Sequence, residues 1–391
     1  MENNLLQYPN QWLQLLKPFE ADLSKPQFAN FCQATTAMAV SEHTTINRWC
    51  HLFAPKHQSS LNDFFTRSPW EEQKVHERLS KITVRNIKDA HIGILDDTLS
   101  HKPYAEKMEG LGFHYDGMTG KESKGHSIVT FGFSSRELGF VPFDSTQYLK
   151  DGRSKNDLAC TIIKRAHRYR KLSLYLMDSW YANTKVLSAI KEQSGHYITE
   201  MKSNRNATIN RRCRQVWAHG QYIDAKQFTV VTIKGTKYRF FQCSAFISGR
   251  GLGTVNLVFS QKYEEKEKQW GETHYLITDI LQLPGARVIE LYLLRGGIES
   301  FHREAKQQLG LEHYQLRNGR GIDRYLFLVL LTYVLLLLLC QQLLRKDFVE
   351  RTIGELRQEV KAACYTTMLQ RSKHVKRRHI EVFARELAFA L

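Results

Sequence analysis

The chain has 391 residues, 42% of them hydrophobic, so it is long enough for two or three domains with a substantial core. Its formal net charge of +17 predicts a polyanionic partner, either nucleic acid or an anionic membrane surface. Its seven scattered cysteines form no Cys-x-x-Cys pair and no Cys/His cluster, which argues against a disulfide framework and a structural zinc. The sequence does not open on a signal-peptide pattern, so we expect a cytoplasmic protein.

The first 85 residues carry helical patterns. Ser24 and Gln27 have the spacing of a capping box, so a helix is predicted from there to about Ala39. A short break and a second helix follow, which is compatible with a helix-turn-helix. An ordinary helical bundle explains the pattern equally well.

Two apolar runs predict short buried strands that end in acid. The run at 91–98 places Asp96 and Asp97 after Ile-Gly-Ile-Leu, and the run at 172–181 places Asp178 after Leu-Tyr-Leu-Met. A single aspartate at a strand end is more often a turn or helix-capping residue than a functional one. These aspartates therefore indicate a functional site only if a third acidic residue accompanies them.

The segments around and beyond these acids alternate between strand and helix patterns. Strands are predicted at 127–134, 139–143 and 197–202, and helices at 157–170 and 184–192. From 227 to 280 the pattern is β-rich, with turn residues between the runs. This stretch is longer than one crossover connection needs, so it predicts an inserted β domain.

A fixed pattern of polar residues follows the β-rich stretch. Tyr292, Arg295, Glu299 and Lys306 are separated by two, three and six residues. The pair Gly296-Gly297 interrupts the preceding pattern, so Glu299 is predicted in the first turn of a new helix.

That helix should present acid and base on one side. Glu299, Arg303 and Lys306 fall at i, i+4 and i+7, which places them on one helix face. Such a face suits a nucleic-acid active site, because carboxylates hold Mg²⁺ and cations bind phosphate. A solvated helix with i,i+4 salt bridges is the alternative reading.

The pattern Tyr-(2)-Arg-(3)-Glu-(6)-Lys resembles the signature of a large group of bacterial insertion-sequence transposases of the DDE type. The strings Asp-Asp-Thr and Met-Asp-Ser-Trp-Tyr resemble the first and second aspartate motifs of that family, and the resemblance covers most of residues 90–345. It implies that Asp97, Asp178 and Glu299 are the catalytic residues and bind Mg²⁺, which Mn²⁺ can replace. Asp96 is the weaker alternative at the first position.

The resemblance also implies an α/β fold with an RNase H-like core. The expected domains are a helical N-terminal DNA-binding domain, the core in two parts around an inserted all-β domain, and a C-terminal helical region for dimerisation or DNA contact. Their expected ranges are 1–88, 89–203, 204–284, 285–345 and 346–391.

The implied activity is cut-and-paste transposition of double-stranded DNA. In the family, the signature Tyr and Arg, here Tyr292 and Arg295, grip a phosphate near the cleaved end, and the Lys, here Lys306, contacts the neighbouring backbone. A tryptophan of the inserted domain can stack on a base flipped out during hairpin formation; Trp270 is the candidate and Trp180 its competitor.

Such enzymes act as homodimers on transposon ends and target DNA. We therefore expect a bacterial cytoplasmic protein that is nucleoid-associated when bound to DNA. The alternatives are a two-metal nuclease without strand transfer and a domesticated DNA-binding protein that no longer cuts.

One apolar segment favours a different class. Residues 325–344 just reach the length and hydropathy of a transmembrane helix and are bracketed by basic residues. Gln341 and Gln342 would lie inside such a span, however, and the resembling family has a very apolar core helix at this point. We therefore expect a buried core helix and no membrane association.

Overall fold

The computed structural model describes residues 8–42, 45–52, 57–117, 119–248, 252–344 and 352–371. The chain divides into two compact units, which we call the helical unit (Met1–Asn86, Ser100–His126, His302–Leu391) and the sheet unit (Ile87–Leu99, Ser127–Phe301). The protein is thus a mixed α/β structure with a large mixed sheet.

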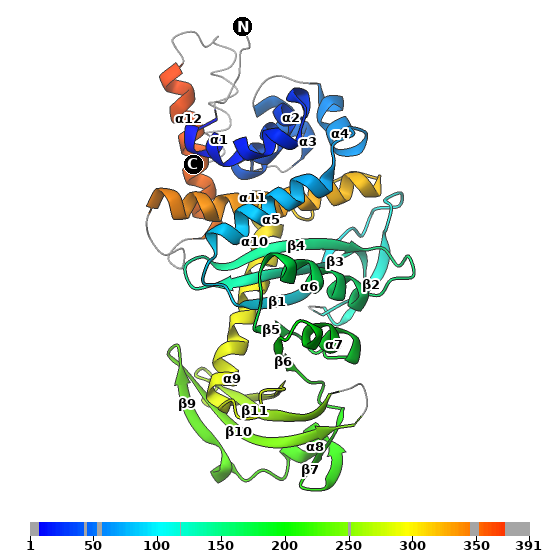
Figure 1. Ribbon diagram of the computed structural model, residues 1–391, viewed down its shortest axis with the longest axis vertical. Coiled ribbons are helices and arrows are strands. Elements are labelled where there is room, and N and C mark those ends of the chain that lie inside the picture. The colour runs from blue at the N-terminus through cyan, green and yellow to red at the C-terminus, as the bar shows by residue number, and fades with distance from the viewer. Residues whose placement is uncertain are drawn as a thin grey trace. The chain divides into compact units, whose positions relative to one another are not determined.

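The sheet unit begins with five strands and two helices. Their bounds are β1 (Ile92–His101), β3 (Lys121–Ser135), β4 (Gly139–Tyr148), α6 (Lys155–Tyr169), β5 (Leu174–Met177), α7 (Thr184–Glu192) and β6 (His196–Glu200). The strands are hydrogen-bonded in the order β4-β3-β1-β5-β6, and β5 is parallel to both of its neighbours. Helix α6 packs on β4 and α7 packs on β6 (Figure 1).

Local sequence explains where these helices begin. The Ser154 hydroxyl accepts a hydrogen bond from the Asp157 N–H, and the Asp157 carboxylate accepts from the Ser154 N–H, which forms a capping box before α6. The Asn183 side chain accepts from the N–H of Val186 and caps α7. All four residues of β5 are buried, as expected for a central parallel strand.

The β-rich stretch adds its strands to the same sheet through β12, which pairs antiparallel with β6. The order continues β12-β11-β10-β7-β8, and β9 pairs with β10. The bounds are β7 (Asn206–Ile209), β8 (Arg212–Gln215), α8 (Val216–Gly220), η2 (Ala225–Gln227), β9 (Thr229–Ile233), β10 (Thr236–Ile247), β11 (Gly253–Glu264) and β12 (Gln269–Thr278). Helix α9 (Gly285–Tyr292) then packs on β6 and β10–β12.

A short 3-10 turn, η3 (Leu293–Arg295), links α9 to α10 (Gly296–Gln308). The predicted new helix therefore begins at Gly296, and Glu299 lies in its first turn as expected.

The strand that carries the first acids is longer than predicted. We expected it to end at Asp96 or Asp97, but β1 continues to His101. Thr98 and Leu99 favour extended backbone, and Leu99 is buried, so pairing continues past the acids. Because side chains alternate along a strand, Asp96 and Asp97 face opposite sides of the sheet.

The helical unit contains most of the remaining helices. Its elements are α1 (Asn10–Leu16), η1 (Lys17–Asp22), α2 (Lys25–Val40), α3 (Ile46–Leu52), α4 (Gln58–Thr66), α5 (Glu72–Asn86), β2 (Gly112–Asp116), α11 (Gly319–Leu344) and α12 (Ile353–Arg371). The predicted capping box of Ser24 and Gln27 is present before α2. The sequence also carries a cluster of lysine and arginine residues at 373–378, which lies outside the described residues.

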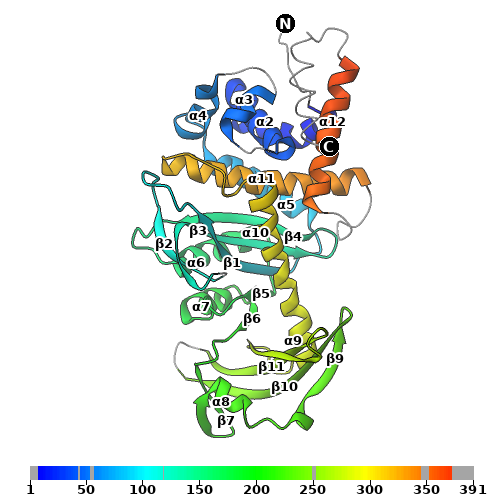
Figure 2. The same cartoon turned by 180° about the vertical axis from the view of Figure 1, so that it is seen from behind.

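The apolar segment forms most of α11. This helix is long and apolar enough to cross a membrane, but 94% of its most apolar segment is buried. It packs against α2, α4, α5 and α12, and Figure 2 shows it beside α5. The burial matches the prediction of a core helix.

Candidate active site

The predicted acids come from neighbouring elements of the sheet unit. Strands β1 and β5 are parallel with Leu95 opposite Met177, so the following residues, Asp96 and Asp178, emerge at the same level. Glu299 comes from the first turn of α10. The structure thus brings together Asp96 and Glu299, which are 203 positions apart in the chain and share the guanidinium of Arg295.

Burial and mutual repulsion shape the protonation of these acids. Burial raises the pKa of Asp96 to about 7; Arg295 opposes the rise, and the charges of Asp178 and Asp97 add to it. Burial likewise raises the pKa of Asp178, again against the effect of Arg295 and with that of Asp97. The carboxylates are close enough to disfavour one another's charge, so the site demands cations.

Arg295 supplies one cation. Its guanidinium donates to Oδ2 of Asp96 at 2.7 Å and to Oε1 of Glu299 at 2.5 Å. Burial works to lower the pKa of Arg295, but the carboxylates, Asp96 foremost, outweigh it and hold the pKa above its usual value. One planar guanidinium therefore fixes the position of Glu299 relative to β1.

Lys155, the first residue of α6, supplies the second cation. Its Nζ lies 2.5 Å from Oδ2 of Asp97, with both side chains largely buried. The hydroxyl of the fully buried Tyr181 donates to Oδ1 of Asp97 at 2.9 Å, and that of Ser127 lies 3.3 Å from Oδ2. Both carboxylate oxygens of Asp97 are thus fixed by contacts with protein side chains.

The donor set fits a hard divalent cation, because only carboxylate oxygens converge here. Within the described residues, however, no group of three or more His, Cys, Asp and Glu side chains is already arranged as a metal site. The ammonium of Lys155 contacts Asp97, a carboxylate that a metal would use. Metal binding at Asp97 would therefore displace Lys155 rather than fill a preformed cage.

Two signature atoms have no partner. The Tyr292 hydroxyl and the Nε of Arg295 are shielded from solvent and have no hydrogen-bond partner among the described residues. A buried polar group left unsatisfied costs about 1–3 kcal/mol. Both atoms are therefore suited to receive ligand oxygens near the carboxylates.

The two tryptophan candidates differ in their surroundings. The Trp180 side chain is 51% exposed, and its backbone N–H donates to Oδ1 of Asp178 at 3.0 Å. The ammonium groups of Lys155 and Lys202 lie 5.7 Å and 5.4 Å from its ring centroid. Trp180 is therefore an exposed aromatic face between cations, directly beside the acids.

Trp270 is half-buried in the β11–β12 hairpin. Its ring contacts Tyr263 edge-on at 5.1 Å and lies 4.8 Å from the guanidinium of Arg239.

Arg303 and Lys306 lie on the part of α10 that belongs to the helical unit, where Nζ of Lys306 is 3.2 Å from Oε1 of Glu312.

Comparison with known proteins decides the family. A family model described as the transposase DDE domain matches residues 150–335, and one described as DDE superfamily endonuclease matches residues 29–222. A probable transposase for insertion sequence element IS701 from Microchaete diplosiphon is 24% identical over 277 residues, which are 68% of this chain and 70% of that protein. The chain is an insertion-sequence DDE transposase.

The fold has a solved counterpart. A cryo-EM structure of the piggyBac transposase synaptic complex with hairpin DNA matches with a TM-score of 0.50 and 10% identity, over 93% of this chain and 76% of that chain. At this identity the likeness concerns the fold alone. The endonuclease family match spans Asp97 and Asp178, and the transposase-domain match spans Asp178 and Glu299.

Sequence reasoning missed two contacts of this transposase site. Lys155 and Tyr181 reach Asp97 from positions 58 and 84 residues away. Tyr181 carried a signal, because it belongs to the second aspartate motif. Lys155 carried none, since a lysine at a helix start is common on solvated surfaces.

Proposed function

We propose that this transposase cleaves the ends of its element by two-metal phosphoryl transfer and joins the freed 3′ ends to target DNA. The observation that supports this most is an acidic cluster in which the guanidinium of Arg295 joins Asp96 to Glu299 and acts on the charge of Asp178. Asp97, held by Lys155, adds its negative charge to this cluster. Repelling carboxylates in a half-buried site are the arrangement that divalent cations need.

The residues divide the chemistry between them. Two bound Mg²⁺ ions, which Mn²⁺ can replace, would activate the attacking oxygen and stabilise the leaving oxygen. Asp97, Asp178 and Glu299 would hold these ions. The Tyr292 hydroxyl and the Nε of Arg295, which lack partners among the residues that the structure describes, would donate to oxygens of the scissile phosphate.

Other cations would hold the DNA on either side of that phosphate. Arg303 and Lys306 are assigned to the backbone next to the cleaved bond. Trp180 or Trp270 would stack on a base that leaves the helix if cleavage passes through a hairpin. The exposure of Trp180 and its two lysine neighbours support the former.

We infer an RNase H-like core from residues 89–203 and 285–345, with 204–284 as the inserted β domain. Support comes from the acids on the parallel strands β1 and β5, and from the limits of β6 at Glu200 and of α9 at Gly285. Residues 1–88 would bind the transposon end, and 346–391 would mediate dimerisation or DNA contact.

The partners follow from the activity. Double-stranded DNA, both element ends and target, is the substrate, and the net charge of +17 favours it. We propose a homodimer in the end complex and a cytoplasmic, nucleoid-associated location without membrane attachment.

The test uses the full-length protein, its own element's end DNA and Mg²⁺, with products resolved on denaturing gels. Nicked, hairpin and joined products are expected. Asp97→Asn, Asp178→Asn and Glu299→Gln should each abolish nicking while end binding in EDTA survives. Glu290→Gln, which changes an exposed glutamate of α9, is the matched control.

Each other outcome has a meaning. Normal nicking by one of the three variants removes that residue from the triad. Nicking without joined product favours a nuclease, and specific end binding without nicking favours a domesticated DNA-binding protein.

A further inference from the structure

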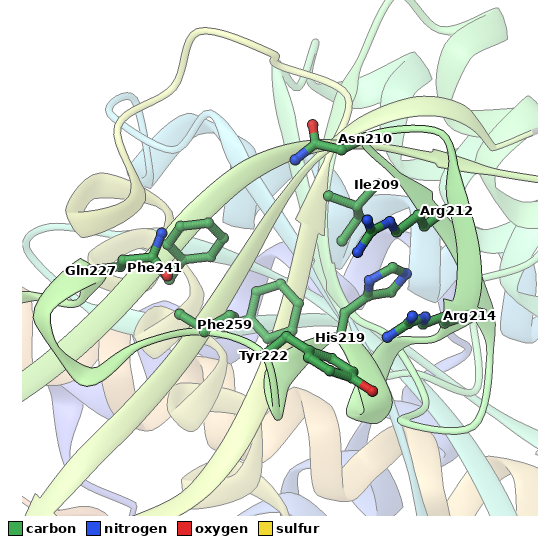
Figure 3. Close-up of a pocket in the computed structure, with 10 residues that line it drawn as sticks. Ile209, Asn210, Arg212, Arg214, His219, Tyr222, Gln227, Phe241 and Phe259 are labelled. Atoms are coloured by element: carbon green, nitrogen blue, oxygen red, sulfur yellow. The ribbon is translucent and has the colours of Figure 1, made fainter.

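A pocket of about 420 Å³ lies in the sheet unit, on the inserted β strands (Figure 3). Phe241 and Phe259 line one side of it, and Arg212 and Arg214 stand on the other side beside Ile209. The pocket thus combines an aromatic floor with two cations, and none of these residues belongs to the carboxylate site.

The hairpin β7–β8 creates the charged side. Asn210 and Arg211 both have positive φ, of 49° and 64°, which gives the two-residue turn that matches strand twist. Residues two apart on a strand share a face, so Arg212 and Arg214 project together. Figure 3 shows their guanidinium groups directed towards His219 and Tyr222.

Contacts fix the side chains around the cations. The guanidinium of Arg214 lies 4.4 Å from the ring centroid of Tyr222, which is itself 72% exposed. Nε2 of His219 lies 2.9 Å from the carbonyl oxygen of Ala207, which orients the ring. Because these side chains are already held in place, they lose less conformational entropy when a ligand binds.

The two arginines place two positive charges at the pocket. Among the residues that the structure describes, neither Arg212 nor Arg214 has a carboxylate partner. A planar guanidinium matches the oxygens of a phosphodiester, and an aromatic floor matches the apolar face of the sugar next to it. The ligand class that uses both is a nucleotide unit of a DNA strand.

The sheet order places this pocket far from the acids within the same unit. Six strand spacings separate β5, which Asp178 follows directly, from β8. At about 4.8 Å per spacing this is up to roughly 30 Å, and sheet twist shortens it. Along a duplex with about 3.4 Å per base pair, the separation corresponds to at most about nine base pairs.

We propose that this pocket, which we call the β8 pocket, is a second DNA-binding site that grips the phosphodiester backbone up to about nine base pairs from the cleaved bond. The proposal rests on the proposed function for the position of that bond. The contact is to backbone, so it adds affinity and register without base preference.

The first experiment measures binding of the full-length protein to a fluorescent duplex of arbitrary sequence, in EDTA, over a range of NaCl concentrations. Arg212→Ala/Arg214→Ala should flatten the plot of log Kd against log salt by about two units of slope and raise Kd by on the order of 10- to 50-fold at 0.1 M salt. Arg212→Lys/Arg214→Lys should restore the slope but only part of the affinity, because lysine lacks the bidentate fork.

The matched control is Lys171→Ala/Lys191→Ala, which removes two exposed positive charges from other elements of the sheet unit. An unchanged slope in the arginine variant, or an equal loss in the control, overturns the proposal. Thermal unfolding of each variant separates loss of the site from loss of the fold.

A second measurement locates the contact. Cys213 is exposed on the other face of β8, which is an edge strand, so an iron chelate on a linker that reaches round this edge can cleave DNA bound by the arginines. Cys213→Ser is the control. Cuts within about nine base pairs of the nicked bond are expected; cuts centred farther away, or none, contradict the site. Because the salt titration needs no cleavage, it can succeed or fail independently of the proposed transposase chemistry.

Discussion

Replacing Arg295 by lysine tests how the site holds its third acid. The guanidinium donates to Asp96 at 2.7 Å and to Glu299 at 2.5 Å, and a single ammonium on a flexible stem cannot reproduce both bonds in one plane. A hydrogen bond to a charged group is worth about 1.5–3 kcal/mol, so losing one should slow cleavage about 10- to 150-fold. Arg295→Ala loses both and should be slower still.

The assay is single-turnover nicking of a labelled end duplex with Mg²⁺, at protein concentrations that saturate binding. Arg287→Ala is the matched control, because Arg287 makes an i,i+3 pair with Glu290 at 2.5 Å on the preceding helix but both side chains are exposed. Exposed pairs contribute about 0–1 kcal/mol, so its rate should stay near the wild-type rate. Arg295→Lys within twofold of wild type, or an equal loss in Arg287→Ala, would refute the reasoning.

Three further substitutions probe other contacts. Lys155→Met removes the cation that occupies Asp97, so the Mg²⁺ concentration for half-maximal nicking should fall by on the order of tenfold, and a higher requirement would contradict this competition. Trp180→Ala should slow hairpin formation about 5- to 150-fold but spare the first nick; the same pattern in Trp270→Ala instead would assign the stacking role to Trp270. Arg324→Met should lower the free energy of unfolding in urea by about 3–5 kcal/mol, because the fully buried guanidinium of Arg324 donates to three backbone carbonyls and to Glu72. Arg320→Ala, which changes an exposed side chain that pairs with the same glutamate, should lower it by less than about 1 kcal/mol.

Elements with a local cause were predictable from the sequence. The capping box of Ser24 and Gln27, the start of α10 at Gly296 and the buried strand before Asp178 all depend on residues a few positions apart. The apolar run of α11 also indicated its burial, although the same composition would serve in a membrane. Short-range patterns therefore gave most helix and strand positions.

Features with a long-range cause were not predictable. Strand β1 continues past its acids because neighbouring strands offer partners, which the run at 91–98 does not reveal. The contact of Lys155 with Asp97 and the β8 pocket both depend on folding that joins distant segments. The aspartate motifs indicated an active site, but they did not show that protein cations occupy its carboxylates.

The placement of Asp96 and Asp97 connects the length of β1 to the chemistry. Had the strand ended at these acids, both side chains could have turned towards one metal site. Because β1 continues, they alternate: Asp96 meets Arg295 of the segment that carries Glu299, and Asp97 meets Lys155 of α6. Asp96 therefore acts on Glu299 through a shared guanidinium, whichever aspartate binds metal. Asp96→Asn should accordingly weaken nicking without the complete loss expected for Asp97→Asn, and a complete loss confined to Asp96→Asn would move the first metal ligand to Asp96.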